Sequence, residues 1–148
     1  MDDAKLYLRD ISQAYVQSTT KLNRDFYIVA PRELTDELGI DEGSIIKVIK
    51  PLYGVPEAGN HWFNTYHTHH TKELRIEQST YDPCLLHCIE GSQFGVVGLQ
   101  TDDTLFLANT SFAAAEETNL QKAQFLAKER DILTTESLLK FNGGLIQL

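Results

Sequence analysis

The spacing of apolar and polar residues predicts short strands and helices in mixed order. Alternating or β-branched runs typical of strands occupy residues 5–11, 25–30, 44–50, 84–89, 94–99 and 104–108. Helical spacing is expected after Ser12, over 31–40, over 60–74, and from Phe112 to Leu133 behind a candidate cap at Ser111. Strands and helices do not alternate regularly. We therefore expect an α+β fold, in which helices cover one face of an antiparallel sheet.

Turn residues and one helix face add detail to this pattern. Residues 142–144, Asn-Gly-Gly, are typical of a hairpin turn, and residues 90–92 predict a second turn. Gly39 is expected to close the helix at 31–40. Positions four apart form one predicted buried face of the 60–74 helix, which packs on the sheet: Trp62, Tyr66, His70 and Leu74.

The length of 148 residues suits one domain, and a hydrophobic fraction of 42% is enough for a core. The formal net charge is −8, and the 13 Lys and Arg residues form no dense run. Proteins that bind nucleic acid alone usually carry a basic face. Either nucleic acid is not the partner, or the basic surface lies outside this sequence. No membrane span or signal peptide is evident, so we expect an intracellular protein with no membrane partner.

Two adjacent aspartates, Asp102 and Asp103, interrupt the apolar segment VVGLQTDDTLFLAN. Strands on both sides place the pair at a hairpin tip, where a divalent cation such as Mg²⁺ would offset their repulsion. An adjacent pair rarely completes such a site alone, and Asp10, at the end of an earlier strand, is the natural third carboxylate. A solvated Asp-Asp turn is the simpler explanation on spacing alone.

Four segments carry a resemblance to a known family: RDISQAYVQ, KPLYGVPEAGNHWF, YDPCLL and VVGLQTDDTLFLAN. In this order and spacing, the chain resembles reverse transcriptases of copia-type retrotransposons, particularly those of filamentous fungi, from about Leu8 to Ile146. The resemblance implies a polymerase palm-like antiparallel sheet with helices packed on one face. It also implies that residues 1–148 are a palm-region fragment of an enzyme whose fingers lie largely, and whose thumb and RNase H lie entirely, outside this sequence.

The resemblance implies RNA-directed DNA polymerase chemistry, in which a nucleotidyl group passes from a dNTP to a primer 3′-hydroxyl on an RNA or DNA template. Asp10, Asp102 and Asp103 would be catalytic. With the backbone carbonyl of Ile11, they would also bind two Mg²⁺ ions, or Mn²⁺ in their place. Tyr15 would lie under the incoming sugar and exclude a 2′-hydroxyl. The remaining polyprotein would be a partner, in a cytoplasmic particle or the nucleus.

The resemblance places further substrate contacts in the segment 51–62 and before the aspartate pair. Glu57 stands where Gln is common in the family, Asn60 where Arg is common, and Gln100-Thr101 where Tyr-Val is common. The implied substrate-binding residues are Tyr15, Glu57, Asn60 and Gln100. These departures leave an alternative open, namely a catalytically inactive retrotransposon remnant or a non-enzymatic interaction domain. For the chain by itself we expect weak nucleic-acid binding and little processive synthesis.

Histidines crowd the middle of the sequence and raise the question of a structural metal. HTHH at 67–70 resembles a metal tract, and His87 lies between Cys84 and Cys88. No cysteine or acidic partner stands at the spacing of a zinc site. We therefore interpret these residues mainly as members of the core.

Overall fold

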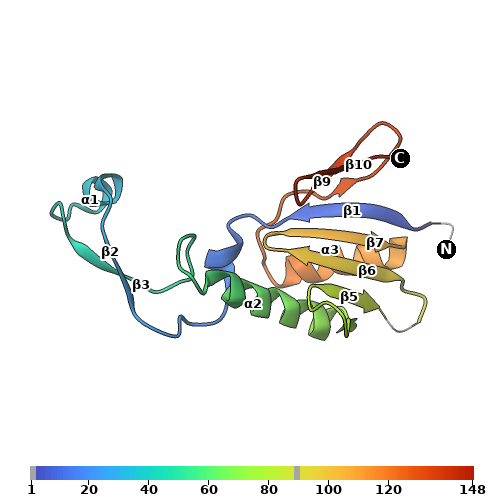
Figure 1. Ribbon diagram of the computed structural model, residues 1–148, viewed down its shortest axis with the longest axis horizontal. Helices are drawn as coiled ribbons and strands as arrows, with labels where there is room; N and C mark the ends of the chain where they lie inside the picture. The colour runs from blue at the N-terminus through green and yellow to red at the C-terminus, as the bar shows by residue number, and fades with distance from the viewer. Residues whose placement is uncertain (1–2, 89–90) are drawn as a thin grey trace.

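The computed structural model describes residues 3–88 and 91–148. Figure 1 shows a body, in which a sheet is covered by two helices, and an arm that projects from one end of it. The antiparallel α+β expectation is confirmed. Within the described residues, no helix is both long enough and apolar enough to pass through a lipid bilayer.

The body is built on a six-stranded sheet with the order β4-β5-β6-β7-β1-β8, in which neighbouring strands are antiparallel. The strands are β1 (Lys5–Asp10), β4 (Ile76–Gln78), β5 (Leu85–Cys88), β6 (Gly95–Gln100), β7 (Asp103–Ala108) and β8 (Asp131–Ile132). The pattern of apolar and polar residues did not predict β4 or β8. Residue 89 of the predicted strand at 84–89 lies outside the described residues, as does residue 90 of the predicted turn at 90–92.

Register in the three central strands divides the side chains between two faces. Tyr7, Phe106 and Val97 are direct partners across β1, β7 and β6. All three are buried, and the rings of Tyr7 and Phe106 stack with their centroids 5.0 Å apart. Directly paired residues point to the same side of a sheet. This row therefore marks the core face, which the helices cover.

Helix α2 (Ala58–Glu73) packs on that face through the predicted stripe. Trp62, Tyr66 and His70 are buried, as is Leu74 just after the helix. The Trp62 indole stacks on Tyr66 and donates from Nε1 to the carbonyl oxygen of Thr101 at 2.8 Å. The prediction that Trp62 packs this helix on the sheet is confirmed, and the hydrogen bond also ties the helix to the β6–β7 turn.

Helix α3 (Thr110–Lys122) is shorter than predicted. Asn109, not Ser111, is the cap, because its Oδ1 accepts from the backbone N–H of Phe112 at 3.0 Å. The helix stops before Leu133 because Gln124 adopts a left-handed φ of 58°, which ends the regular backbone. The apolar residues after Gln124 also fit a helical period. Residues 131–132 nevertheless form β8, which pairs antiparallel with β1.

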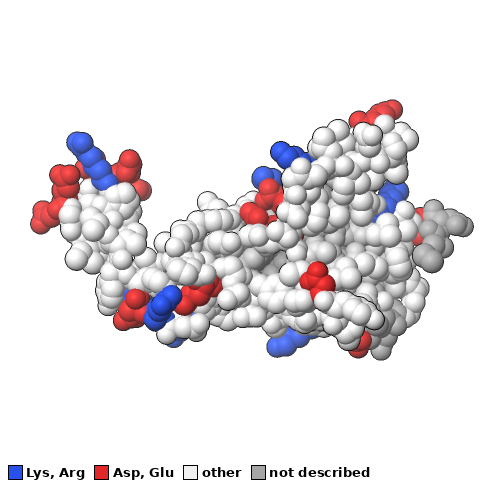
Figure 2. Space-filling model, viewed as in Figure 1, with Lys and Arg blue, Asp and Glu red and all other residues white. Residues whose placement is uncertain are grey.

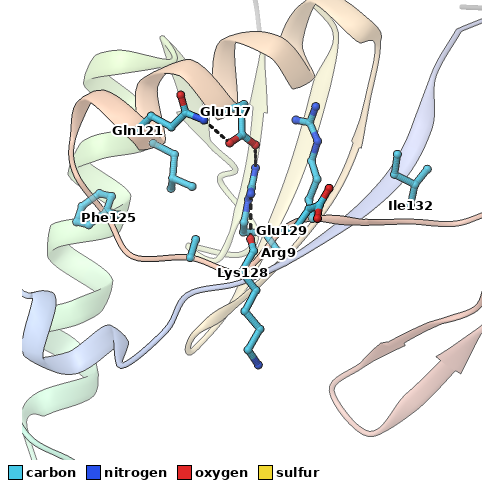
Figure 3. A pocket seen from close by; sticks show the side chains of 10 residues that line it. Arg9, Glu117, Gln121, Phe125, Lys128, Glu129 and Ile132 are labelled. Atoms are coloured by element: carbon cyan, nitrogen blue, oxygen red, sulfur yellow. Dashed lines mark hydrogen bonds and ion pairs between the residues drawn. The ribbon is translucent and has the colours of Figure 1, made fainter.

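A buried ionic cluster fixes α3 to the sheet. Arg9 and Glu116 are 2% and 3% exposed, and Arg9 Nη2 donates to Glu116 at 2.7 Å and to Glu117 at 2.6 Å. The Arg9 Nη1 atom donates to the carbonyl oxygen of Lys128 at 3.2 Å. Figure 3 shows Arg9 between Glu117 and the backbone of Lys128. Burial raises the pKa of Glu116 although Arg9 and Arg130 act in the opposite direction, whereas the Arg9 hydrogen bond lowers the pKa of Glu117.

The predicted helix after Ser12 is wrong in type. A single 3₁₀ turn, η1 (Ala14–Gln17), forms instead, and Gln13 precedes it with a left-handed φ of 50°. No side-chain cap satisfies its first N–H groups, so Ser12 is not a cap. The turn brings Tyr15 against the start of α2, where the Tyr15 hydroxyl lies 3.8 Å from the position a Cβ would take on Gly59.

The arm consists of β2 (Phe26–Val29), α1 (Arg32–Leu38) and β3 (Ile45–Val48), with β2 antiparallel to β3. Gly39 closes α1 with a φ of 63°, as predicted. At the other end of the chain, β9 (Leu139–Phe141) and β10 (Gly144–Ile146) form the predicted hairpin. Asn142 and Gly143 both have positive φ there, as a type I′ turn requires.

Candidate active site

Three predicted site residues lie in one row across the ends of three strands. Asp10 of β1 and Gln100 of β6 are both direct partners of Asp103 in β7. Because the core row through Tyr7 lies an odd number of positions away along β1, the aspartate row points away from α2 and α3. Asp10 and Asp103 are half-buried and Gln100 is exposed, so the carboxylates reach solvent.

Asp102 lies beside this row in the two-residue turn between β6 and β7. Thr101, the other turn residue, has a φ of 55°, which is the sign that a type II′ turn needs at its first position. Hydrogen bonds to the backbone carbonyl oxygens of both turn residues hold the turn in place. The Trp62 indole donates to Thr101, and the Ile11 N–H donates to the Asp102 carbonyl at 2.9 Å. Strand register and these two hydrogen bonds, which the buried residues Trp62 and Ile11 donate, therefore place the three aspartates at the same end of the sheet.

The negative charges of the neighbouring aspartates affect one another's pKa. Burial raises the pKa of Asp103, and the charges of Asp102 and Asp10 add to that increase. The Tyr53 hydroxyl donates to Asp102 Oδ2 at 3.4 Å. Burial raises the pKa of Tyr53, and the Asp102 charge raises it further, so the phenol stays a donor. A cation at this edge would be favoured by all three carboxylates.

Lys128 supplies such a cation. Its backbone N–H donates to the carbonyl oxygen of Asp10 at 2.9 Å, and its Nζ atom lies 2.5 Å from Asp10 Oδ2. Asp10, by hydrogen bond and by charge, raises the pKa of Lys128, and Asp103 and Asp102 raise it further. In Figure 3 the Lys128 side chain extends away from Arg9 and α3. No sequence signal indicated this residue, because residues 112–133 were predicted to form one continuous helix, which gives Lys128 no pairing with β1.

The carboxylate oxygen atoms of Asp10, Asp102 and Asp103, at this end of the sheet, are of the type that Mg²⁺ and Mn²⁺ prefer. The N–H and C=O of one extended residue point to the same side of a strand, so the Ile11 carbonyl faces the turn that carries Asp102. Among the described residues, no three His, Cys, Asp or Glu side chains are close enough together to hold a metal ion. The ligand types fit a divalent cation, and in the arrangement present the Lys128 ammonium neutralises Asp10.

Two of the predicted substrate-binding residues share a pocket of about 360 Å³ beside the turn. Tyr15 and Asn60 line it together with Trp62, Leu99 and Thr101. The ring of Tyr15 also packs against that of Tyr53, with their centroids 4.3 Å apart. Tyr15 is thus half-buried in an aromatic pair whose other member contacts Asp102.

Glu57 lies with a different set of partners. Its Oε1 atom accepts from the backbone N–H of Asn23 at 2.9 Å, and its carboxylate is 3.5 Å from Arg24 Nε and 3.6 Å from His61 Nε2. These contacts join the start of α2 to the segment that leads into the arm. Gln100, in contrast, stands in the aspartate row.

The histidines behave as core residues where they are most buried. His70 is 1% exposed and donates from Nδ1 to the Tyr66 carbonyl oxygen at 3.0 Å. Burial lowers the pKa of His70 to about 3, so the ring is neutral near pH 7. Cys84 and Cys88 pack against the core cluster.

No family model, no curated protein and no solved structure matches this chain.

Proposed function

We propose that this chain is the palm region of an RNA-directed DNA polymerase of the copia retrotransposon type. One observation carries the proposal. Asp10 and Asp103, which are far apart in sequence, are direct partners at the ends of two neighbouring inner strands of an antiparallel sheet, with Asp102 in the adjoining turn. The resemblance assigns the catalytic carboxylates to these three residues, and their placement at the same end of neighbouring strands supports that assignment.

The proposed reaction is nucleotidyl transfer to a primer. The primer 3′-hydroxyl loses its proton to water and its oxygen forms a bond to the α-phosphorus of a dNTP. The bond from that phosphorus to the bridging oxygen breaks, and pyrophosphate leaves. Two Mg²⁺ or Mn²⁺ ions, when bound, lower the pKa of the 3′-hydroxyl and neutralise the leaving group. Asp10, Asp102, Asp103 and the Ile11 carbonyl would hold them.

The remaining site residues would position substrate. Tyr15, fixed by its packing on Tyr53 and by the start of α2, would lie under the deoxyribose and exclude a 2′-hydroxyl. Asn60 shares the pocket of Tyr15, and Gln100, the direct partner of Asp103, would contact the primer end. The rest of the polyprotein, with its fingers, thumb and RNase H, would supply most of the grip on nucleic acid, within an intracellular particle or the nucleus.

A second candidate is an inactive remnant or an interaction domain, and Glu57 is the observation that favours it. Where the family commonly has a neutral amide, this chain has a carboxylate engaged with Asn23, Arg24 and His61. A net charge of −8 further disfavours unaided binding of nucleic acid.

A single-nucleotide incorporation assay distinguishes the two candidates. A primer annealed to an RNA template is mixed with excess protein, Mg²⁺ and one dNTP, and primer lengths are resolved on a gel. Wild type should add one nucleotide, and Asp102→Asn should be slower by at least about 100-fold. Asp41→Asn, in the exposed loop between α1 and β3, removes the same charge and should match wild type. Equal rates for wild type and Asp102→Asn, or no addition by wild type, would favour the second candidate.

A further inference from the structure

A hydroxyl, an imidazole and a carboxylate are joined in series where the arm meets the body. Thr20 Oγ1 lies 2.6 Å from His61 Nδ1, and His61 Nε2 lies 3.6 Å from Glu57 Oε1. Thr20 belongs to the segment that leads from η1 to β2, whereas Glu57 and His61 belong to the start of α2. These three residues, here named the threonine relay, have the groups and the order that enzymes use to activate a hydroxyl nucleophile.

The carboxylate determines which nitrogen of His61 carries the proton. A negative charge beside Nε2 favours a proton on that atom, which leaves Nδ1 as an acceptor. The Thr20 hydroxyl then donates to Nδ1, which is the arrangement in which an imidazole can take the hydroxyl proton. Glu57 is itself fixed, because its Oε1 atom accepts from the Asn23 N–H at 2.9 Å and its Oε2 atom lies 3.5 Å from Arg24 Nε.

The relay joins a buried base to an accessible hydroxyl. His61 is 6% exposed, whereas Thr20 is exposed, so a substrate can reach the hydroxyl without displacing the imidazole. The preceding residue fixes the segment to α2, because the Thr19 backbone N–H donates to Thr65 Oγ1 at 3.1 Å. Thr65 lies one helical turn after His61 and donates to the His61 carbonyl oxygen at 3.0 Å. Contacts outside the relay therefore hold the Thr20 hydroxyl against the imidazole.

Thr20 also lines a pocket of about 470 Å³, here named the arm-base pocket. The pocket lies between residues 19–25, which lead into β2, and residues 47–50, at the end of β3. Four of the 13 Lys and Arg residues line it, namely Lys21, Arg24, Lys47 and Lys50. Apolar side chains complete the lining, namely Leu22, Val48 and Ile49. Figure 2 shows basic and acidic side chains side by side where the arm joins the body.

The arm-base pocket favours a bound group that is negatively charged. Asp25 is the acidic residue of the lining, and it pairs with Lys47 at 2.7 Å. Lys50 donates to a neutral group, the Ser18 carbonyl oxygen, at 2.8 Å and keeps its full charge. Cations beside Thr20 would also stabilise the negative charge that develops on a carbonyl oxygen when a hydroxyl attacks its carbon. The arrangement therefore fits an ester whose acyl group carries a carboxylate.

We propose that Thr20 is the nucleophile of an acyl-transfer site in which His61 is the general base, and that the substrate is an ester with an anionic acyl group. Thr20 and His61 are the catalytic residues of this site. Glu57 is a positioning residue, because it acts only through the imidazole. The site shares no residue with the carboxylate row, and its reaction needs neither nucleic acid nor a divalent metal.

Two steps complete the reaction. In the first, Thr20 Oγ1 bonds to the carbonyl carbon and the hydroxyl proton passes to His61 Nδ1. The bond from that carbon to the leaving oxygen breaks, and the leaving alcohol takes the proton from His61. In the second, a water oxygen bonds to the acyl carbon and a water proton passes to His61. The bond from that carbon to Thr20 breaks, Thr20 Oγ1 recovers a proton from His61, and the carboxylic acid leaves.

The test is the hydrolysis of para-nitrophenyl hydrogen succinate in EDTA, followed by the absorbance of the released nitrophenolate. Wild type should turn the ester over above the buffer rate. Thr20→Val and His61→Ala should each lower kcat/KM by at least about 100-fold, and the double variant should lose no more than either. Thr118→Val is the matched control and should match wild type, because Thr118 is an exposed threonine of α3 whose hydroxyl donates to a backbone carbonyl oxygen.

Three further measurements separate catalysis from a structural role. Added imidazole should restore part of the activity of His61→Ala and none of that of Thr20→Val. Glu57→Gln should lower kcat by about tenfold and leave KM unchanged. Mass spectrometry after an acid quench should place the succinyl group on Thr20, as an ester that hydroxylamine removes.

Lysine variants test the substrate class. Lys50→Gln should lower kcat/KM for the succinate ester by about fivefold and leave kcat/KM for the neutral para-nitrophenyl acetate unchanged. Lys140→Gln, on β9, should change neither value. Equal effects of Lys50→Gln on the two esters would contradict the anionic substrate class.

Three outcomes would overturn the acyl-transfer site. The first is no release of nitrophenolate by wild type above the buffer rate. The second is equal kcat/KM in wild type and Thr20→Val, with circular dichroism showing both proteins folded. The third is a succinyl group bound to Lys21 as an amide instead of to Thr20 as an ester, which would show that an exposed lysine, and not the threonine relay, reacts.

Discussion

The Nζ atom of Lys128 lies 2.5 Å from Oδ2 of Asp10, and the backbone N–H of Lys128 donates to the carbonyl oxygen of the same residue. The two residues are thus joined through both backbone and side chain at the end of β1. The ammonium neutralises a carboxylate that the proposed function assigns to a divalent cation. Binding of that cation and the ion pair are therefore in competition.

Replacing Lys128 by methionine should strengthen the binding of a divalent cation. Lys128→Met keeps the aliphatic stem and removes the competing charge, so the affinity for Mn²⁺ should rise on the order of fivefold. Titration followed by electron paramagnetic resonance of free Mn²⁺ measures it. Lys122→Met, at the end of α3, makes the same charge change and should have little effect. Equal Mn²⁺ affinities in wild type and Lys128→Met would show that no competition exists.

The Arg9–Glu116 pair should be essential to stability because it is buried. Arg9→Met leaves the Glu116 carboxylate without its nearest cation and should lower the free energy of unfolding by about 3–5 kcal/mol. Adding Glu116→Gln removes the orphaned charge and should recover at least about 1 kcal/mol. Urea denaturation gives both values. Arg32→Met, which breaks an exposed pair with Asp36, should change stability by less than about 0.5 kcal/mol. If Arg9→Met proves as mild as Arg32→Met, the buried pair does not have this role.

Gly95 is required by the packing of Phe112 rather than by backbone conformation. A Cβ at Gly95 would lie 2.7 Å from atoms of the Phe112 ring, which is fully buried. Gly95→Ala should therefore destabilise the fold by about 1–3 kcal/mol, measured by urea denaturation. Gly98→Ala in the same strand has its nearest neighbour at 3.7 Å and should cost nothing. Combining Gly95→Ala with Phe112→Leu should relieve the clash. Equal stabilities for the two single variants would contradict this contact.

His70 should make the fold sensitive to mild acid. Its pKa is about 3 in the folded chain and about 6.5 when unfolded, so the unfolded state takes up the proton first as the pH falls. The stabilising effect is present above about pH 6.5 and is lost as the pH falls toward 3, by up to about 1.4 kcal/mol per pH unit. Denaturation between about pH 7 and pH 5 measures the slope. His70→Leu should flatten it, and an unchanged slope would assign the acid sensitivity to other groups.

The sequence predicted the aspartates but not their register. Asp10 at a strand end and Asp103 after a turn are visible as local patterns, whereas their pairing depends on which strands become neighbours in the sheet. Lys128 was missed because residues 125–132 fit a helical period, and only the left-handed backbone at Gln124 redirects them along β1.

Arg9 shows a second limit of local patterns. An arginine in an alternating strand is expected to face solvent, but the row it shares with Leu99 and Thr104 faces the helices. Only the carboxylates of Glu116 and Glu117, far along the chain, make its burial possible. The strands and helix of the arm were predicted from local pattern, yet nothing in residues 25–50 indicated that they project from the body.

The most direct test of the account is whether the carboxylate row binds a divalent cation. Isothermal titration calorimetry with Mg²⁺ can compare wild type with Asp10→Asn, Asp102→Asn and the control Asp41→Asn, which lies in the arm. Asp10→Asn and Asp102→Asn should each weaken Mg²⁺ binding by at least about tenfold, while Asp41→Asn should bind as wild type does. Equal affinity for Mg²⁺ in all four proteins would contradict it.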